Sequence, residues 1–251
     1  MSRHKGARLE FLYGRHAVYE SMRAGRRGIY KILAAKGAAE KGVLADILKL
    51  ASDRDIPVVR VDRQILDEKS DAHHGVAASV SAYPYVSVEE ILEKCADSSE
   101  LPFLLALDQV QDPQNLGALL RTAEAAGVHG VFLPHKHSAL VTEAVVRTSA
   151  GASEHLRIAS GNLAQIAEVL KKEDIWVAGL DVDEKAVSIE TADLNRALCL
   201  VVGSEGSGLR RLVRERCDFL IRIPMKGQIE SLNASAAGAV ALYAAALSRS
   251  Q

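Results

Sequence analysis

The sequence LCLVVGSEGSGLRRLVRERCDFLIRIPMKGQIESLNASAAGAVALY occupies residues 198–243. It contains two apolar runs of strand length, Leu198–Val202 and Phe219–Ile223, which are ended by Gly203 and Pro224. Continuous apolar runs of this kind are typical of strands that are buried on both faces in a parallel sheet. The stretch therefore predicts an α/β fold whose sheet includes these two strands.

A helix follows the second strand. Ser231, Asn233 and Ser235 are short polar residues that open an alanine-rich segment, where the first helical turn has N–H groups without partners. Because this helix lacks a polar face, we expect burial on most sides, against its own domain or a partner subunit. Two strand ends and one helix start thus converge with glycines between them, which is where open α/β folds bind ligands.

Alternating helices and strands predict a small α/β domain over residues 11–82, after a basic tail at residues 1–10. Residues 83–100 are predicted to be a linker, in which Ser87–Cys95 forms a short helix or remains part of the linker. The expected elements of the first domain are helices at Gly14–Ala24 and Val43–Ser52 and strands at Ile29–Ala34, Ile56–Val61 and Gly75–Ser81.

A second domain is predicted over residues 101–251, with a mostly parallel sheet flanked by helices. The predicted N-cap of its first helix is Asn115, because an Asn side chain can accept from the free N–H groups of the first turn. The expected elements are strands at Phe103–Leu107, Gly130–Leu133 and Ile175–Leu180, and helices at Leu116–Ala126 and Leu163–Leu170.

The composition is that of an ordinary globular protein, since 48% of the 251 residues are hydrophobic and 25% are charged. The net charge of −1 gives no global argument for nucleic-acid binding. Residues 1–30 nevertheless hold seven Lys/Arg against two Glu, and residues 207–226 hold six against two acidic residues. Each basic stretch fits a phosphate-binding patch and equally well a solvated surface.

Three cysteines without metal-ligand spacing, Cys95, Cys199 and Cys217, favour a reducing cytosol over a disulfide framework. The N-terminus lacks the apolar core of a signal peptide, and no apolar run reaches the roughly 18 residues that span a membrane. His135 and His137 have no third ligand nearby in the sequence, so we expect no metal. These features predict a cytoplasmic protein without membrane or metal partners.

The glycine loop at residues 203–208, GSEGSG, does not fit the common phosphate-binding motifs. It lacks the Lys and Ser/Thr of a P-loop, and its GxxGxG spacing differs from that of a dinucleotide fold. Glu205 would repel a phosphate, so the loop better suits a ligand with hydroxyls, amines or a positive centre. The alternative is a tight turn without a ligand.

The sequence also contains candidate site residues whose roles are ambiguous. Arg121 lies off the apolar face of its helix, where an arginine is either solvated or a fork for phosphate or carboxylate. Ser231 and Asn233 are helix caps or functional groups.

Taken together and in this order, three stretches resemble the motifs of the SpoU (TrmH) family of RNA ribose 2′-O-methyltransferases, within the SPOUT class. They are NLGALLRTA at residues 115–123, VGSEGSGL at 202–209 and IPMKGQIESLNAS at 223–235. The first domain, with FLYGRHAVYE at 11–20 and GVAA at 75–78, resembles the ribosomal-protein-like RNA-binding domain of the RlmB branch. That branch methylates a guanosine in the P loop of 23S rRNA. One departure is His73-His74, which stands before Gly75 where relatives often have Gln.

The resemblance implies a C-terminal trefoil knot, S-adenosylmethionine as cofactor, and a homodimer that completes each site across its interface. It assigns the cofactor pocket to Gly203, Ile223 and Leu232, and the catalytic surroundings to Asn115, Arg121, Glu205, Ser231 and Asn233. The implied reaction methylates the ribose 2′-OH of a guanosine in 23S rRNA. Three alternatives stay open: a tRNA ribose methyltransferase, a resistance-type rRNA methylase, and a non-catalytic RNA-binding assembly factor.

Overall fold

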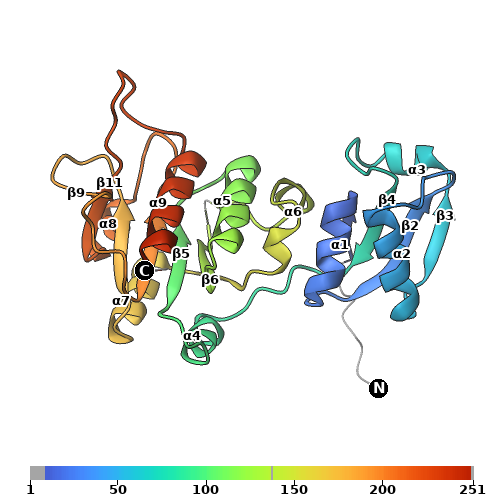
Figure 1. Cartoon of the computed structure of the whole chain (residues 1–251), viewed down its shortest axis with the longest axis horizontal. Helices are drawn as coiled ribbons and strands as arrows, with labels where there is room; N and C mark the ends of the chain where they lie inside the picture. The colour runs from blue at the N-terminus through green and yellow to red at the C-terminus, as the bar shows by residue number, and fades with distance from the viewer. Residues whose placement is uncertain (1–8, 137, 250–251) are drawn as a thin grey trace. The chain divides into compact units, whose positions relative to one another are not determined.

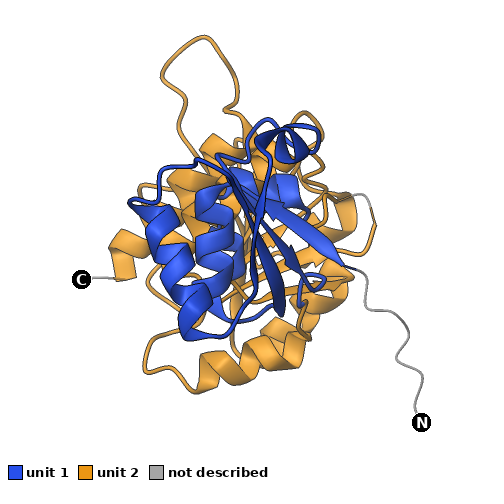
Figure 2. Cartoon of the chain, turned by 90° about the vertical axis from the view of Figure 1, so that its right-hand side faces the viewer, with its two compact units in different colours: residues 1–84, 141–155 blue, residues 85–140, 156–251 orange. Residues whose placement is uncertain are grey.

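The computed structural model describes residues 9–136 and 138–249, so most of the predicted basic tail and His137 lie outside the described residues. The chain divides into two compact units (Figure 2). Unit 1 comprises residues 1–84 and 141–155, and unit 2 comprises residues 85–140 and 156–251.

Unit 1 is built on a four-stranded sheet with the strand order β1-β4-β2-β3, of which β4, β2 and β3 are labelled in Figure 1. β4 pairs antiparallel with β1 and with β2, whereas β2 and β3 are parallel. The strands are β1 (Glu10–Tyr13), β2 (Ile29–Ala35), β3 (Val58–Val61) and β4 (Val76–Val80), and the first three helices are α1 (Arg15–Ala24), α2 (Val43–Asp53) and α3 (Arg63–Asp67).

The helices and strands predicted for the first domain are present, with ends that differ by one or two residues. β1 and α3 were not predicted. β1 has four residues, of which only Leu12 is buried, and α3 has five, of which only Leu66 is buried. Such short elements do not repeat an apolar position often enough to establish a period.

Residues 141–155 fall within the range that the sequence assigned to the second domain, yet they pack in unit 1. They form α6 (Glu143–Thr148) and the 3₁₀ helix η1 (Ala152–Glu154). The Arg27 and Glu154 side chains are 0% and 1% exposed, with Nε 2.9 Å from Oε2 and Nη2 3.1 Å from Oε1. The Tyr83 hydroxyl donates to the Ser153 carbonyl at 2.8 Å. A buried ion pair therefore holds two stretches that are far apart in the sequence.

Unit 2 contains a seven-stranded sheet with the order β7-β6-β5-β10-β8-β11-β9, in which every described strand pair is parallel. This confirms the predicted parallel α/β architecture. The strands are β5 (Phe103–Leu107), β6 (Gly130–Pro134), β7 (Ile158–Gly161), β8 (Trp176–Leu180), β9 (Val187–Ser188), β10 (Leu198–Val202) and β11 (Phe219–Arg222). The helices are α4 (Val88–Ala96), α5 (Pro113–Ala125), α7 (Leu163–Lys172), α8 (Arg211–Arg216) and α9 (Ala234–Arg249).

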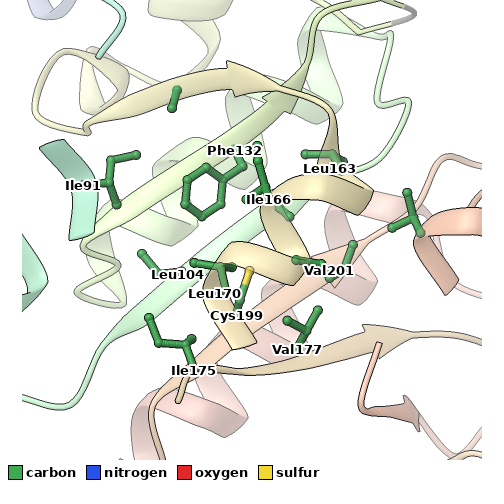
Figure 3. Packing of buried hydrophobic residues seen from close by; sticks show 14 of the residues in the cluster. Ile91, Leu104, Phe132, Leu163, Ile166, Leu170, Ile175, Val177, Cys199 and Val201 are labelled. Carbon is green, nitrogen blue, oxygen red and sulfur yellow. The ribbon is translucent and has the colours of Figure 1, made fainter. Parts of the chain in front are cut away.

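One hydrophobic core of unit 2 lies between the sheet and helices α4 and α7 (Figure 3). Phe132 and Leu104 come from the sheet, and Ile166 from α7. The α4 helix begins with a capping box, in which the Ser87 and Glu90 side chains each accept from the other's backbone N–H. Its Ile91 is fully buried in this core, so the predicted short helix packs as part of unit 2.

The N-cap of α5 differs from the prediction. The helix starts at Pro113, and the Asp112 side chain accepts from the Gln114 N–H at 3.0 Å. Asn115 is therefore inside the first turn and is not the cap. Proline suits the first helical position, because its φ is already helical and its missing N–H would have no partner there.

The α9 helix lies beside α5 (Figure 1), and its small residues allow close contact. A Cβ on Gly238 would overlap the end of the Leu119 side chain. The opposite side of α9 remains open in the single chain, since Val240, Tyr243 and Leu247 are 43%, 47% and 64% exposed. Burial on most sides is thus not achieved within this chain.

The three cysteines are free thiols, and Cys95 and Cys199 are buried. Burial raises the pKa of all three, and that of Cys217 to about 12. Among the helices in the described ranges, none combines the length and apolar character needed to cross a membrane.

Candidate functional site

The three motif stretches that contain the predicted site residues each follow a strand of the unit 2 sheet. Because β5, β10 and β11 are parallel, their carboxyl ends meet at the same edge. The segment before α5 follows β5, the glycine loop follows β10, and residues 223–233 follow β11 and lead into α9. The three motif stretches are therefore arranged around the crevice position where open α/β sheets bind ligands.

The glycine loop is a closed turn. Ser204 and Gly208 exchange two backbone hydrogen bonds, of 3.2 and 3.0 Å. Gly206 and Gly208 have φ angles of 82° and 62°, which favour glycine. Gly203 is buried, and a Cβ there would overlap the Gly208 carbonyl group and approach the Leu209 nitrogen to 2.7 Å. Only glycine at position 203 allows the loop to close in this way.

A side-chain hydrogen bond joins the second and third motif stretches: the Asn233 amide donates to the Glu205 carboxylate. The Asn233 Oδ1 atom also accepts from the Ser235 N–H at 2.8 Å, so Asn233 is the one of the three polar residues predicted to open this helix that caps α9. The Glu205 side chain is thereby held on the outside of the glycine loop, where it is exposed. A fixed, exposed carboxylate beside a glycine turn suits a ligand with a positive centre or hydroxyl donors.

Three further predicted residues lie in the segment between β11 and the start of α9. Ile223 is half-buried, Leu232 is 39% exposed, and Ser231 is exposed three residues before α9. They add apolar surface and a hydroxyl to the segment that joins β11 to α9. A bound adenosine needs apolar surface for its ring and polar partners for its edge, and S-adenosylmethionine adds a cationic sulfonium. The apolar side chains, the hydroxyl and the carboxylate at this edge fit such a ligand.

Asn115 and Arg121 both lie on α5, but the structure does not join them to the Glu205–Asn233 pair. Asn115 is half-buried in the first turn, and Arg121 is exposed nearly two turns further on. Neither side chain forms a hydrogen bond or ion pair with any residue in the described part of the chain. Within one chain, Arg121 is thus a charged group available to a ligand.

Sequence reasoning missed the residues that fix the segment after the glycine loop. Asp108, which directly follows β5, is fully buried and accepts from the Arg210 backbone N–H at 2.8 Å and from its Nε at 2.7 Å. On the next turn, Arg214 Nε donates to Asp181 at 2.9 Å. Neighbouring carboxylates raise the pKa of Arg214, with Asp181 the largest contribution. The sequence signal that could have identified Asp108 is a charged residue directly after an apolar strand.

These contacts also change the interpretation of the basic stretch at 207–226. Arg210 and Arg214 are bound to buried or half-buried carboxylates, and Arg211 pairs with Glu215 at 2.7 Å. The Arg216 side chain lies 3.2 Å from Glu168. Four of its six cationic residues therefore pair with acidic side chains. The pairs of Arg210 and Arg214 are structural, whereas those of Arg211 and Arg216 are exposed and leave both arginines able to bind an anion.

We expect Asp108→Asn to lower the free energy of unfolding by about 1–3 kcal/mol, since it removes the charge that receives two Arg210 donors in a buried position. Urea denaturation measures this change. Asp193→Asn is the matched control, because Asp193 is 60% exposed in its pair with Arg196 and should leave the stability nearly unchanged. Equal, small effects in both variants would contradict a structural role for Asp108.

Comparison with known families supplies independent evidence. Residues 102–243 match the SpoU rRNA Methylase family, and residues 11–86 match the family described as RNA 2′-O ribose methyltransferase substrate binding. YacO of Bacillus subtilis, which is named as a TrmH family tRNA/rRNA methyltransferase, is 39% identical over 236 residues, covering 93% of this chain and 94% of YacO. A similarly named Staphylococcus aureus protein is 40% identical over 234 residues, covering 92% and 93%. The chain belongs to the SpoU rRNA methylase family.

Solved structures share the fold. The SpoU methyltransferase AviRb of Streptomyces viridochromogenes, solved with its cofactor AdoMet, superposes with a TM-score of 0.80 at 22% identity, covering 96% of this chain and 90% of that one. An AdoMet-bound rRNA methyltransferase of Sinorhizobium meliloti gives 0.75 at 23% identity, covering 95% and 87%. The TrmH/SpoU tRNA modifying enzyme of A. aeolicus gives 0.54 at 26% identity, and covers 65% of this chain and 81% of its own.

Proposed function

We propose that the protein transfers a methyl group from S-adenosylmethionine to the ribose 2′-OH of a guanosine in the P loop of 23S rRNA. The observation that carries the proposal is the Glu205–Asn233 hydrogen bond beside the closed glycine loop, within a chain that belongs to the SpoU family. Unit 1, which includes the match to the substrate-binding family, would hold the RNA. The free cysteines support a cytoplasmic location.

Gly203, Ile223 and Leu232 would line the cofactor pocket in this proposal. S-adenosylmethionine supplies an activated methyl group on a sulfonium, so the reaction needs no metal. When bound, it would give its methyl group to the ribose 2′-oxygen, the electron pair of the broken carbon–sulfur bond would stay on sulfur, and the hydroxyl proton would pass to a protein group or water. The protein must align the hydroxyl and accept or relay that proton.

Arg121 is proposed to bind the phosphate beside the target ribose and to stabilise negative charge on the attacking oxygen. Its exposed guanidinium has no carboxylate partner among the described residues, so its charge is available for RNA. A guanidinium barely loses its proton in proteins, which argues against Arg121 as the base. Asn115, Glu205, Ser231 and Asn233 would orient the ribose and the backbone.

A homodimer is proposed because α9 presents Val240, Tyr243 and Leu247 to solvent in the single chain. Association of two copies through this face would bury apolar surface, and it would place a second subunit beside each site. The resemblance implies that the dimer completes the site, which would bring in the contacts that Arg121 lacks within one chain. The trefoil knot of the C-terminal chain is proposed on the same resemblance.

The test is an assay with methyl-labelled S-adenosylmethionine and two substrates, undermodified 23S rRNA and undermodified tRNA. Label at one P-loop guanosine would support the proposal, and label in tRNA would keep the chemistry but replace the substrate. Label at another rRNA nucleotide would indicate a resistance-type methylase. If the cofactor binds and neither RNA is labelled, a pre-ribosomal particle is the next substrate to assay. Absence of both label and cofactor binding would contradict the enzyme proposal.

The proposed role of Arg121 has its own test within this assay. Arg121→Ala and Arg121→Lys are compared by kcat/KM on the labelled RNA. A forked contact to phosphate predicts that lysine restores only a small part of the rate, because an ammonium cannot present two parallel donors. Nearly full rate with lysine would rule out the forked contact.

A further inference from the structure

Unit 1 contains a surface cavity of about 580 Å³ that lies outside the site described above. Three stretches that are distant in the sequence meet there, one from the end of β1 into α1, one from α3 to the loop before β4, and one from α6. None of the lining residues is acidic. They are Tyr13, Gly14, Arg15, His16, Ala17, Arg63, Ala72, His74, Arg147 and Ala150.

The charges around the cavity are only partly compensated. Arg15 donates from Nε to the His74 carbonyl at 3.1 Å and has no carboxylate within ion-pair distance among the described residues. Arg63 lies 3.7 Å from Asp67 in an exposed pair, and Arg147 lies 3.2 Å from Glu143 on its own helix. The Arg63 pair is exposed and contributes little, and the Arg147 side chain is itself 39% exposed beside a half-buried Glu143, so both arginines remain able to bind an anion from solution.

The backbone adds to this positive character. Gly14 has a φ of 96°, and a Cβ there would lie 3.0 Å from the Ala72 carbonyl oxygen, so the loop before β4 sits close against the start of α1. No side chain caps α1 at Gly14, and Arg15, His16 and Ala17 of its first turn line the cavity. Uncapped N–H groups at a helix start favour negative charge.

Tyr13 provides an aromatic wall beside these cations. Its ring is stacked with that of Phe11, with centroids 6.3 Å apart and an interplanar angle of 21°. Burial, and to a smaller extent Glu143, raises the pKa of Tyr13, so its hydroxyl keeps its proton at neutral pH and can donate. Arginines next to an aromatic ring form a combination that proteins use for single-stranded nucleic acid.

We propose that this cavity binds a backbone phosphate of the RNA substrate through Arg15, Arg63 and Arg147. Arg147 comes from α6, which lies inside the SpoU rRNA Methylase match at 102–243, while the other two come from the match to the substrate-binding family. The phosphate site is thus shared by both family segments within unit 1. The inference rests on the proposed function for the identity of the ligand as RNA.

The test uses the full chain with Arg15→Gln and Arg147→Gln combined; Arg147 is exposed and Arg15 is half-buried. Binding of a labelled fragment of 23S rRNA is followed by fluorescence anisotropy at several salt concentrations. We expect the Kd to rise on the order of tenfold, and the slope of log K against log salt to fall by about 1, as for the loss of one phosphate contact. In the methylation assay KM should rise, while kcat and the Kd for S-adenosylmethionine stay unchanged.

Arg23→Gln is the matched control, because Arg23 lies in the last turn of the same helix, outside the cavity, and pairs with Glu20 at 3.2 Å. It should leave RNA affinity and salt slope unchanged. Wild-type affinity and slope in the double variant, or an equal loss with Arg23→Gln, would overturn the proposal. So would tight binding of inorganic phosphate by calorimetry together with unchanged RNA affinity, which would define a small-anion site.

The phosphate site and the proposed methyl transfer can each fail without the other. If the wild-type chain methylates no RNA but binds it with the predicted dependence on Arg15 and Arg147, the phosphate site stands and the proposed function fails. If methyl transfer proceeds with the same KM in the double variant, the proposed function stands and the phosphate site fails.

Discussion

The Gly203→Ala variant is expected to bind S-adenosylmethionine on the order of 100-fold more weakly than the wild-type chain, equivalent to about 3 kcal/mol. The reason is steric. The added methyl group would overlap the Gly208 carbonyl group, which belongs to backbone and cannot rotate away as a side-chain end can. The loop must therefore open, and Glu205 at its tip moves with it. Isothermal titration calorimetry measures the affinity.

The control for this substitution is Gly227→Ala, in the loop between β11 and α9. A Cβ at Gly227 would have no atom within 4 Å, and its φ is not positive, so the affinity should stay within about twofold. Urea denaturation of both variants measures the free energy of unfolding, which overpacking alone lowers by about 1–3 kcal/mol. A variant that stays folded but binds the cofactor weakly has therefore lost affinity through the loop itself. Wild-type affinity in Gly203→Ala would exclude the glycine loop from the cofactor site.

The Arg27→Met variant is expected to lose about 3–5 kcal/mol of unfolding free energy, because it leaves the Glu154 carboxylate buried without its cation. Methionine fills a similar volume, so the change tests charge more than packing. Chemical denaturation at pH 8 measures the loss. Arg23→Met, which removes an exposed ion pair with Glu20, should cost less than about 1 kcal/mol.

The unfolding free energy that Arg27→Met loses should also depend on pH, in a defined direction. Burial raises the pKa of Glu154 even with Arg27 beside it, and removing Arg27 takes away the main influence that lowers that pKa. A carboxyl with a raised folded-state pKa favours folding at low pH, and this contribution disappears as pH rises through its folded pKa. The deficit of Arg27→Met should therefore be smaller at pH 5 than at pH 8. A deficit that does not change with pH would contradict burial of a charged Glu154. Adding Glu154→Leu should recover much of the stability.

The sequence predicted the parallel sheet of unit 2 because its strands are buried on both faces and therefore appear as continuous apolar runs. β10, for example, is Leu198–Val202 in both prediction and structure. Asn233 was predicted at the start of α9 because capping is local chemistry between neighbouring residues. The same reasoning failed for Asn115, since two residues compatible with the cap stand close together and the proline at 113 favours the earlier one.

Contacts between distant residues could not be predicted in this way. Asp108 and Arg210 are separated by 102 positions, and no local pattern relates a residue after β5 to one after β10. The position of Glu154 against Arg27 has the same origin, since 127 residues separate them. The motif resemblance located Glu205 and Asn233 as site residues, whereas their direct hydrogen bond became apparent only from the fold.

Because residues 141–155 belong to unit 1, the polypeptide passes between the units three times, after residues 84, 140 and 155. A gene fragment that encodes residues 1–84 alone would omit Glu154 and Ser153, the partners of Arg27 and Tyr83. Recombination at a single junction would likewise separate the two segments of unit 1, residues 1–84 and 141–155. We therefore expect the substrate-binding unit to be inherited together with the methyltransferase chain that completes it, and its RNA preference to evolve by substitution within unit 1.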